Sequence, residues 1–526
     1  MAFMNHLIHD SLFDSAERTP AAEALAYGDA RCSYAQLAAQ VRAVAACVLQ
    51  ARLAPGARVA VYMEKRIENV AAMFGAAAAG CVFVPVNPLL KPEQVAYILA
   101  DCNVRLLATT PERLAQLAPV LARCPDLQAV LLTDGTTAST FDALPVLAWP
   151  APAGTDAAAA PHRRIDTDVA AILYTSGSTG QPKGVVLSHR NMVAGAHSVA
   201  SYLGLRADDR LLAVLPFSFD YGLSQLTTAF LRGACVVLMN YLFPKDIVTM
   251  VARERITGLA AVPPLWIALA RLAWPVDCTL RFITNSGGAM PVPTVQALQA
   301  ALPDTQVFLM YGLTEAFRST YLPPDEVARR PDSIGRAIPN AEILVVRPDG
   351  TPCDADEPGE LVHRGALVAL GYWNDPARTA QRFRPAPGQE PGLPLPELAV
   401  WSGDTVRRDA DGFLYFIGRS DDMIKVSGYR VSPTEIESVL YETGLVAEAA
   451  AFGIDHPQLG QAIAVIAVPV DEATDDAALL AECKRRLPAY MVPARVDLRS
   501  APLPRNPNGK IDRNALRLAL QSNLSS

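Results

Sequence analysis

The sequence lacks the features that mark several classes of protein. Its nine cysteines are scattered without a CxxC pair, which excludes an obvious disulfide framework or zinc site. It has no run of clustered Lys or Arg, and 53 acidic residues outnumber 46 basic ones, which argues against nucleic acid as a partner. The seven histidines show no spacing typical of metal ligands. A net charge of −7 is still compatible with an anionic small ligand, since positive charge can be gathered locally.

Long hydrophobic segments are also scarce. The most apolar one, residues 70–86, falls short of the roughly 18 residues that a membrane span requires, and it is rich in Ala and Gly. We expect it to form a buried helix that ends at Gly80, followed by a short strand. The first 20 residues lack a basic stretch followed by an apolar core, so they do not resemble a signal peptide. These features predict a cytoplasmic protein without a transmembrane segment.

The sequence does contain a series of short β-type runs separated by helical stretches. This alternation predicts an α/β fold with buried, mostly parallel strands, and 526 residues are enough for a large, multi-lobed body. Several runs lead into loops rich in Gly, Ser and Thr, the position at which open α/β sheets bind ligands. The runs lie at residues 58–63, 81–86, 171–175, 211–217, 234–239, 258–264, 281–288 and 307–312.

The pattern changes further along the chain. From about residue 342, shorter alternating strands with turns predict a smaller β-rich subdomain. The last part of the chain has the pattern of a separate α+β unit. We therefore predict two domains, an N-terminal body of residues 1–418 and a C-terminal lid of residues 419–526.

Local signals accompany this division. Stretches rich in Pro, Ala and Gly at 149–165 and 385–397 are typical of linkers or exposed loops. Ser432 followed by Pro433 is typical of a helix start in the C-terminal unit. We expect Ser432 to be the N-cap, Pro433 the first helical residue, and Glu435 the residue that completes a capping box.

The segment YTSGSTGQPKG, residues 174–184, is the most distinctive in the chain. It follows a buried strand, and its small residues can turn backbone N–H groups and hydroxyls onto a polyphosphate while Lys183 adds a cation. It is not a Walker loop, because Gly184 stands where that loop has Ser or Thr to hold magnesium. The alternative is an ordinary structural turn. The candidate phosphate-binding residues are Thr175, Ser176, Gly177, Ser178, Thr179, Gly180 and Lys183.

This segment resembles the phosphate loop of the ANL superfamily, which comprises acyl-CoA synthetases, adenylation domains of peptide synthetases and luciferases. Its members join a carboxylate to the α-phosphate of ATP, giving an acyl-adenylate and pyrophosphate, and a thiol then displaces AMP. The resemblance implies ATP and Mg²⁺ as cofactors, and CoA or a phosphopantetheine thiol as co-substrate. It continues in order through YGLTE (311–315), GEL (359–361), WSGD (401–404), GRSDD (418–422) and NPNGK (506–510).

The resemblance assigns roles to residues of these motifs. The first step joins two anions, so it needs positive charge, and Lys510 is the implied main cation, with Lys183 and Thr175 assisting. Glu315 is the implied Mg²⁺ ligand. Asp404 would accept hydrogen bonds from the ribose hydroxyls, and Arg419 would assist at the ribose or phosphate. The other implied nucleotide contacts are Ser286, Gly287, Gly288 and Ala289 at the adenine, Tyr311 packed on it, Gly312, and Thr314 at the α-phosphate.

The resemblance also implies a movement of the C-terminal domain. Asp421 falls where the superfamily has its hinge, and hinge residues absorb a backbone change without taking part in the chemistry. The domain would rotate between an adenylating pose, with Lys510 in the site, and a thiolating pose. In the second pose Ser427, Gly428 and Tyr429 would face the site.

The segment LPFSFDYGL, residues 215–223, bears on the substrate. A carboxylate in an otherwise apolar pocket is costly unless it is paired, so Asp220 suggests a cationic group on the substrate. The alternative is that Asp220 caps the following helix. Arg318 either lines the same pocket or pairs with a neighbouring acid, the interpretation that we favour. Further candidates for the pocket wall, or for plain core, are Tyr221, Ser224, Trp266 and Met310.

Two substrate classes stay open. The sequence around these segments resembles stand-alone acyl-CoA ligases of the exosortase-associated type and the related prolyl-carrier-protein ligases. The main prediction is an acyl-CoA ligase for a carboxylic acid. The alternative is activation of an amino or imino acid and its loading onto a free-standing carrier protein, since we find no carrier domain in the sequence. A non-catalytic nucleotide-binding protein is disfavoured because five residues are retained: Lys183, Glu315, Asp404, Arg419 and Lys510.

Overall fold

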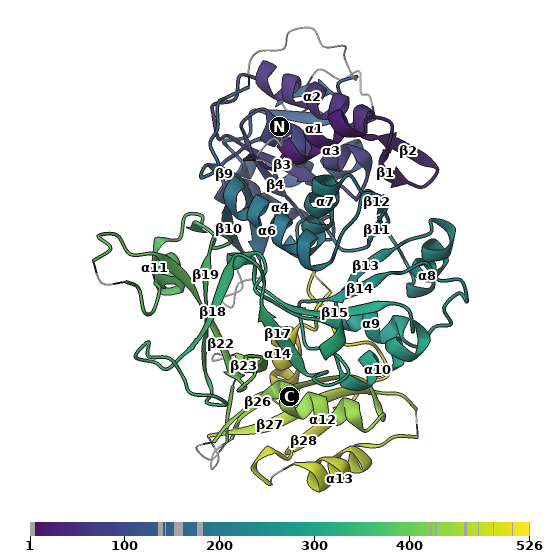
Figure 1. Ribbon diagram of the computed structural model, residues 1–526, viewed down its shortest axis with the longest axis vertical. Helices are drawn as coiled ribbons and strands as arrows, with labels where there is room; N and C mark the ends of the chain where they lie inside the picture. The colour runs from purple at the N-terminus through teal and green to yellow at the C-terminus, as the bar shows by residue number, and fades with distance from the viewer. Residues whose placement is uncertain are drawn as a thin grey trace.

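The protein is built from three β-sheets and the helices that cover them (Figure 1). The sheets have 14, 9 and 5 strands within the described part of the chain. In Figure 1 the C-terminal domain, coloured yellow-green to yellow, lies below the body. The computed structural model describes residues 6–134, 140–141, 144–151, 161–175, 182–390, 392–419, 423–426, 429–456, 460–471, 473–487, 489–507 and 509–524.

The 14-stranded sheet begins with a parallel half. Its strands are buried because helices cover both faces, so they are apolar throughout rather than alternating. The carboxyl ends of parallel strands point to one edge, and this edge carries several of the predicted site residues. The strands are β1 (Glu23–Tyr27), β12 (Cys235–Leu238), β11 (Arg210–Ala213), β13 (Gly258–Ala261), β14 (Phe282–Asn285) and β15 (Gln306–Tyr311), with β2 (Ala30–Ser33) antiparallel to β1.

The same sheet continues in antiparallel strands beyond β15. This part contains the smaller β-rich subdomain that is predicted from about residue 342. Some of its strands precede that residue in the chain, and the others follow it. They are β16 (Thr320–Leu322), β17 (Ser333–Ala337), β23 (Leu414–Arg419), β22 (Leu398–Arg408), β19 (Gly359–Gly365), β18 (Ala341–Val346) and β21 (Phe383–Pro385).

The 9-stranded sheet is mostly parallel as well. At one edge, the antiparallel strands β10 and β20 extend the sheet beyond β9. β10 follows the segment 176–181 in the chain and pairs directly with β9. The eight predicted strands are confirmed. Three of them are β3, β4 and β9 of this sheet, and the others lie in the parallel half of the first sheet. The strands are β20 (Gly371–Tyr372), β10 (Lys183–Ser188), β9 (Val169–Thr175), β4 (Val82–Pro85), β3 (Arg58–Tyr62), β5 (Val104–Thr109), β6 (Ala129–Leu132), β8 (Leu144–Ala148) and β7 (Thr140–Phe141).

The helices of the body pack against these sheets. The apolar segment 70–86 forms α3, followed by Gly80 in the left-handed region and strand β4, as predicted. No helix in the described part of the chain combines the length and apolar character needed to cross a membrane. The helices are α1 (Asp10–Arg18), α2 (Tyr34–Gln50), α3 (Ile67–Ala78), α4 (Pro92–Asp101), α5 (Pro111–Leu117), α6 (His189–Tyr202), α7 (Asp220–Arg232), α8 (Pro244–Arg253), α9 (Pro263–Leu269), α10 (Val292–Ala301) and α11 (Pro376–Arg382).

The C-terminal domain is an α+β unit with its own core. The predicted boundary between 418 and 419 stays a prediction, because residues 420–422, between β23 and β24, lie outside the described residues. Its elements are β24 (Ile424–Val426), β25 (Tyr429–Val431), α12 (Pro433–Glu442), β26 (Val446–His456), β27 (Gly460–Pro469), α13 (Asp476–Arg486), β28 (Arg495–Leu498) and α14 (Arg513–Leu524).

The start of α12 corrects one local prediction. Ser432 is the N-cap residue and Pro433 the first helical residue, as expected, but the Ser432 side chain makes no capping hydrogen bond and Glu435 closes no capping box. The Ser432 hydroxyl instead donates to the carbonyl oxygen of Ile417 in β23. The hydroxyl therefore ties α12 to the large sheet, a tertiary contact that the local pattern could not reveal.

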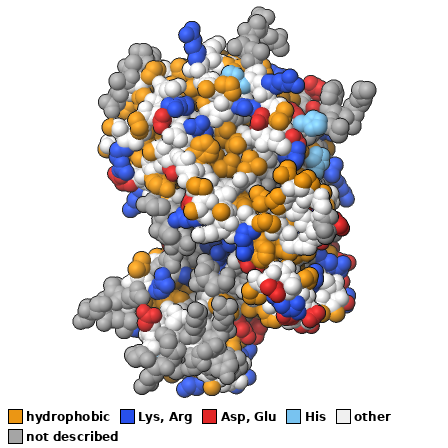
Figure 2. All heavy atoms as spheres, turned by 90° about the vertical axis from the view of Figure 1, so that its left-hand side faces the viewer, with side chains coloured by type: hydrophobic (Ala, Val, Ile, Leu, Met, Phe, Trp, Pro, Cys, Tyr) orange, Lys and Arg blue, Asp and Glu red, His pale blue; other side chains and the backbone are white. Residues whose placement is uncertain are grey.

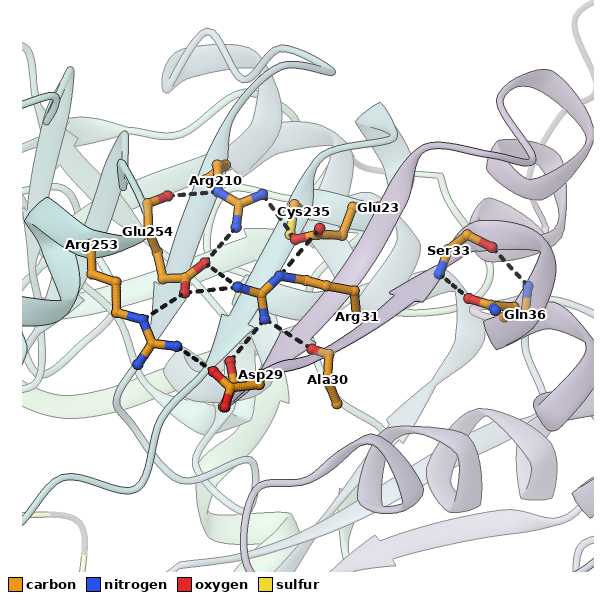
Figure 3. Close-up of polar contacts among 11 residues, drawn as sticks. Glu23, Asp29, Ala30, Arg31, Ser33, Gln36, Arg210, Cys235, Arg253 and Glu254 are labelled. Carbon is orange, nitrogen blue, oxygen red and sulfur yellow. Dashed lines mark hydrogen bonds and ion pairs between the residues drawn. The ribbon is translucent and has the colours of Figure 1, made fainter.

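A network of arginines and carboxylates joins the first hairpin to the large sheet (Figure 3). The buried Glu254, just after α8, accepts from Arg31 Nη2 of β2 at 2.9 Å and from Arg210 Nη2 of β11 at 3.0 Å. Arg210 Nη1 also donates to Glu23 of β1 at 2.9 Å. Because each charge has a partner, we interpret this network as a structural connection rather than a ligand site.

Candidate active site

Four groups of predicted residues meet where the ends of β9, β14 and β15 approach the C-terminal domain. Figure 2 shows several Lys and Arg side chains around an indentation near the middle of this face. In Figure 1 a yellow segment extends from the lower domain up toward β15. The groups are centred on Glu315, Asp404, Lys510 and Asp220.

The first group joins Lys183 to Glu315. Lys183 begins β10 and is paired with Thr175 at the end of β9, while Glu315 lies in the 3-10 turn η2 (Thr314–Ala316) that follows β15. The Lys183 Nζ lies 2.9 Å from Glu315 Oε1 and 2.8 Å from the Tyr372 hydroxyl. Tyr372 in turn donates to Glu315 Oε1 at 2.5 Å. One carboxylate oxygen thus receives both donors.

Glu315 is held in its ionised form. Burial alone would raise the pKa of this carboxyl, but the nearby charges of Lys183 and Arg382 and the Tyr372 hydrogen bond lower it to about 2. An ionised carboxylate is the ligand that Mg²⁺ prefers, and magnesium sites commonly use one carboxylate with phosphate oxygens. The described residues contain no group of three or more metal-ligating side chains that would form a complete protein cage. Glu315 therefore fits a magnesium ion that is shared with a phosphate ligand.

The second group surrounds Asp404 in β22. Tyr311, at the end of β15, donates its hydroxyl to Asp404 Oδ2, and Arg419 Nη1 lies 3.6 Å from Asp404 Oδ1 across the β22–β23 pair. Burial raises the pKa of Tyr311, and the Asp404 carboxylate raises it further, so the phenol stays protonated and donates. The Asp404 backbone N–H donates to Ser402 Oγ at 3.0 Å, which holds this carboxylate in place.

The third group brings Lys510 of the C-terminal domain against Gly287 of the body. Gly287 follows β14 in the left-handed region, at φ +86°, and a Cβ on it would lie 3.0 Å from Lys510 Cε. Only glycine allows both this backbone conformation and this close approach. The Lys510 ammonium lies 5.6 Å from the centre of the Phe219 ring. The lysine therefore enters a space bounded by the turn after β14 and the residue before α7.

A turn presents Lys510. Gly509 N–H donates to the Asn506 carbonyl oxygen at 2.9 Å, and Lys510 N–H donates to Asn506 Oδ1 at 3.0 Å. From the body, Asn87 Nδ2 donates to the carbonyl oxygen of Pro507 at 2.9 Å. The C-terminal domain is thus attached to the body one turn away from the lysine that it contributes.

The environment of Lys510 is partly buried and anionic. Burial is the largest influence on the pKa of Lys510 and lowers it. Three carboxylates within electrostatic range act in the opposite direction and favour the ammonium form. They come from all the other groups of the site: Asp220, Asp404 and Glu315.

The fourth group is centred on Asp220. Asp220 is the first residue of α7, and Phe219 is the N-cap, so the alternative interpretation, in which Asp220 caps this helix, is wrong. Arg318 Nη1 lies 2.8 Å from Asp220 Oδ2, which confirms that Arg318 pairs with a neighbouring acid. Thr314 donates its hydroxyl to Asp220 Oδ1 at 3.2 Å. In this structure, therefore, Thr314 is occupied by a carboxylate rather than turned to an outside ligand.

The other predicted pocket residues lie around this pair. Tyr221 donates to or accepts from Thr284 Oγ1 at 2.5 Å, and Trp266 Nε1 donates to the Thr284 carbonyl oxygen at 3.0 Å. Met310 Sδ accepts from the Tyr202 hydroxyl at 3.0 Å. Three hydroxyls are buried without a hydrogen-bond partner among the described residues, those of Thr175, Ser218 and Ser224.

Part of the predicted site cannot be placed. The phosphate-loop residues Ser176 to Gly180 and the hinge-side residues Asp421, Ser427 and Gly428 lie outside the described residues, and for Tyr429 only the backbone in β25 is described. Three residues of the site were not predicted: Tyr372, Arg382 and Phe219. Phe219 directly precedes Asp220 in the predicted segment, so it could have been found. Tyr372 is brought to Glu315 by the pairing of β20 with β10, which no motif of the sequence indicates.

These observations define a class of protein. A large α/β body carries a polar site at its strand ends, and a second domain completes that site with a lysine. The chain belongs to the AMP-binding enzyme family. The model of this family matches residues 12–373, and the model of the AMP-binding enzyme C-terminal domain matches residues 435–510. The predicted superfamily and α/β fold class are confirmed.

Curated relatives cover nearly the whole chain. An L-proline–L-prolyl-carrier-protein ligase of Pseudomonas fluorescens is 30% identical over 97% of this chain and 98% of the relative. Tyrocidine synthase 3 of Brevibacillus parabrevis is 31% identical over 96% of this chain, but the chain spans 7% of that relative's length. The chain therefore corresponds to one part of such a synthase.

Solved structures show the same fold. An anthranilate CoA ligase in complex with anthranoyl-AMP has a TM-score of 0.87 and 25% identity, covering 98% of this chain and 97% of the other. The o-succinylbenzoate coenzyme A synthetase of Bacillus subtilis, in complex with ATP and magnesium ion, has a TM-score of 0.80 and 26% identity, covering 96% of this chain and 98% of the other.

Proposed function

We propose that this chain uses ATP and Mg²⁺ to convert a carboxylic acid into an acyl-adenylate and then transfers the acyl group to a thiol, with CoA as the main candidate acceptor. One observation carries the proposal: Lys510, from the C-terminal domain, enters a buried site of the body that holds the carboxylates of Asp220, Asp404 and Glu315. A solvated surface lysine would have no need of the glycine that makes room for it.

In the first half-reaction an oxygen of the substrate carboxylate attacks the α-phosphorus of ATP, and the bond to pyrophosphate breaks. Two anions approach each other, so catalysis depends on fixed positive charge where negative charge develops. Lys510 supplies this charge beside the reacting groups. Arg419 and Lys183 would act at the phosphates, each of them held in place by a carboxylate.

Glu315 is the residue that would hold Mg²⁺, with phosphate oxygens completing the coordination. When bound, the ion would neutralise phosphate charge. Lys183 and Tyr372 fix the orientation of the Glu315 carboxylate through its Oε1 atom, which leaves Oε2 for the metal. Thr175, whose hydroxyl is buried without a partner among the described residues, is a second group available to the phosphates.

The ribose contact is proposed for Asp404. Its carboxylate is buried, anchored by Tyr311 and flanked by Arg419. A carboxylate held in this way accepts hydrogen bonds from vicinal hydroxyls without losing its own orientation. The purine contact is assigned to Gly287 and Gly288 in the turn after β14, where a ligand can approach the backbone, with Ser286, Ala289 and Gly312 beside them.

In the second half-reaction a thiol sulfur attacks the acyl carbon, the bond to AMP breaks, and the thiol proton is released. We propose that the C-terminal domain turns for this step, because Lys510 and its turn occupy the space next to Gly287 in the present pose. Asp421 would be the hinge, and residues 427–429 would then face the site.

Loading of an amino or imino acid onto a carrier protein is the second candidate function. The observation that favours it is the similarity to a prolyl-carrier-protein ligase, since this chain covers 98% of that relative. The two candidates share the adenylation step and differ in the acid and in the thiol that accepts it.

The test is ATP–pyrophosphate exchange with purified protein across a panel of aliphatic, aromatic and amino acids, followed by mass detection of the thioester. We expect exchange that depends on the acid and a product with CoA. A thioester that forms only on a phosphopantetheinylated carrier would support the second candidate. Nucleotide binding without exchange for any acid would contradict both candidates and indicate a non-catalytic protein.

A further inference from the structure

The buried pair of Asp220 and Arg318 has a bearing on which acid the site accepts. Both side chains are almost fully buried, with side-chain exposures of 4% for Asp220 and 2% for Arg318, and the two atoms that face each other are 2.8 Å apart. At this distance and burial the two opposite charges compensate each other almost completely. Asp220 is therefore already neutralised by the protein.

Arg318 cannot easily leave this position. Its Nη1 also donates to the Phe317 carbonyl oxygen at 2.9 Å, and its guanidinium carbon lies 4.6 Å from the centre of the Tyr221 ring. Thr314 holds the other oxygen of Asp220 from the opposite side. Both partners are fixed by neighbours on different elements, so the pair is a permanent part of the site and not a transient contact of mobile side chains.

Donors are in surplus around this pair. Arg318 Nε and Nη2 are buried and have no hydrogen-bond partner among the described residues. A nearby third charge, the ammonium of Lys510, is also a donor without acceptor capacity. An ammonium on the substrate would add one more positive charge and three more donors, and it would have to compete with Arg318 for Asp220. A hydroxyl, a carbonyl or an apolar group meets no such conflict.

We propose that Arg318 is a specificity-determining residue, which takes the place beside Asp220 that a substrate ammonium would otherwise fill. The site then selects acids that carry no α-ammonium group. This inference rests on the proposed adenylation function and names its substrate class: carboxylic acids that carry no ammonium group, in preference to amino or imino acids.

The test compares two acids of nearly the same shape, proline and cyclopentanecarboxylate, which differ in the ring ammonium. ATP–pyrophosphate exchange gives kcat/KM for each acid with the unmodified protein. We expect cyclopentanecarboxylate to be favoured by at least about tenfold, because an unpaired buried charge is strongly rejected. A preference for proline would overturn the inference while leaving the adenylation function intact. Exchange with no acid of any kind would contradict the adenylation function itself.

Variants separate a role in specificity from a role in folding. Arg318→Met leaves Asp220 without its partner, so the ratio of kcat/KM for proline to that for cyclopentanecarboxylate should rise by about tenfold or more. Arg318→Lys keeps the charge and should keep the original ratio. The double variant Asp220→Asn with Arg318→Met has no buried charge to compensate and should again favour the uncharged acid. A ratio that stays the same in all three variants would overturn the inference, even if the absolute rates fall.

Discussion

At the scale of single residues, the site is a set of carboxylates, each of which has a fixed cationic or hydroxyl partner. Lys183 and Tyr372 hold Glu315, and Tyr311 holds Asp404. These partners do more than neutralise charge, because they fix the orientation of each carboxylate. A single loss would free a carboxylate to rotate or to bind a proton.

The ionised state of Glu315 predicts a pH-dependent contribution to stability. Its pKa is about 2 in the folded protein, against an ordinary value of 4.5, so the folded state favours the carboxylate. The contribution is present above about pH 4.5 and is lost as the pH falls toward 2, and it amounts to roughly 3 kcal/mol. We expect the free energy of unfolding, measured with urea, to lose this contribution below pH 4.5 in the unmodified protein. The variant Glu315→Gln should not show this loss. Parallel stability curves for both proteins from pH 6 to pH 3 would contradict this assignment.

Most of the site could be predicted from motifs, but most of its pairings could not. Lys183, Glu315, Asp404, Arg419 and Lys510 stand in recognisable segments. The contact between Arg318 and Asp220 joins residues 98 positions apart, and its geometry depends on where η2 lies relative to α7. For that reason the sequence suggested a substrate cation beside Asp220, whereas the structure provides a protein cation.

At the scale of elements, two turns control the approach of Lys510. One follows β14 and contains Gly287, and the other is the 506–509 turn, which ends with Gly509 at φ +82°. The eight predicted strands were correct because apolar runs of this length are buried strands in a parallel sheet. The capping box at α12 was not, since the Ser432 hydroxyl found a partner in the large sheet. Local patterns identify elements better than they identify the partners of polar side chains.

The variant Gly287→Ala tests the turn after β14. Its new Cβ would press on Lys510 Cε, and the flexible lysine would yield, so we expect the protein to fold while ATP–pyrophosphate exchange falls by roughly tenfold. Gly388→Ala is the matched control, because Gly388 has a similar φ of +68° but open space where a Cβ would stand. The control should lose about 1 kcal/mol of stability and no activity. Equal activity in the two variants would argue against the contact.

At the scale of the whole molecule, the two domains share one site, which lies at the strand ends of the body. The C-terminal domain contacts the body through Asn87 and Pro507 and contributes Lys510 beside the turn after β14. The domain organisation was predictable from the change in sequence pattern. The pose of the domain was not, because it depends on contacts between residues 420 positions apart.

The proposed rotation of the C-terminal domain predicts a separation of the two half-reactions. Asp421→Pro restricts the backbone at the proposed hinge, so the domain should keep the pose that places Lys510 in the site. We expect adenylate formation, measured by ATP–pyrophosphate exchange, to be preserved and thioester formation to be lost. An equal loss of both half-reactions would indicate a structural defect instead of a blocked rotation.

The most direct test of the account is the contribution of Lys510 to adenylation. Lys510→Ala should reduce ATP–pyrophosphate exchange by on the order of 10²–10³-fold, the effect of removing one group that stabilises developing charge. Lys484→Ala, an exposed lysine of α13 in the same domain, is the matched control and should exchange at the original rate. An exchange rate in Lys510→Ala equal to that of Lys484→Ala would contradict the claim that the C-terminal domain completes the active site.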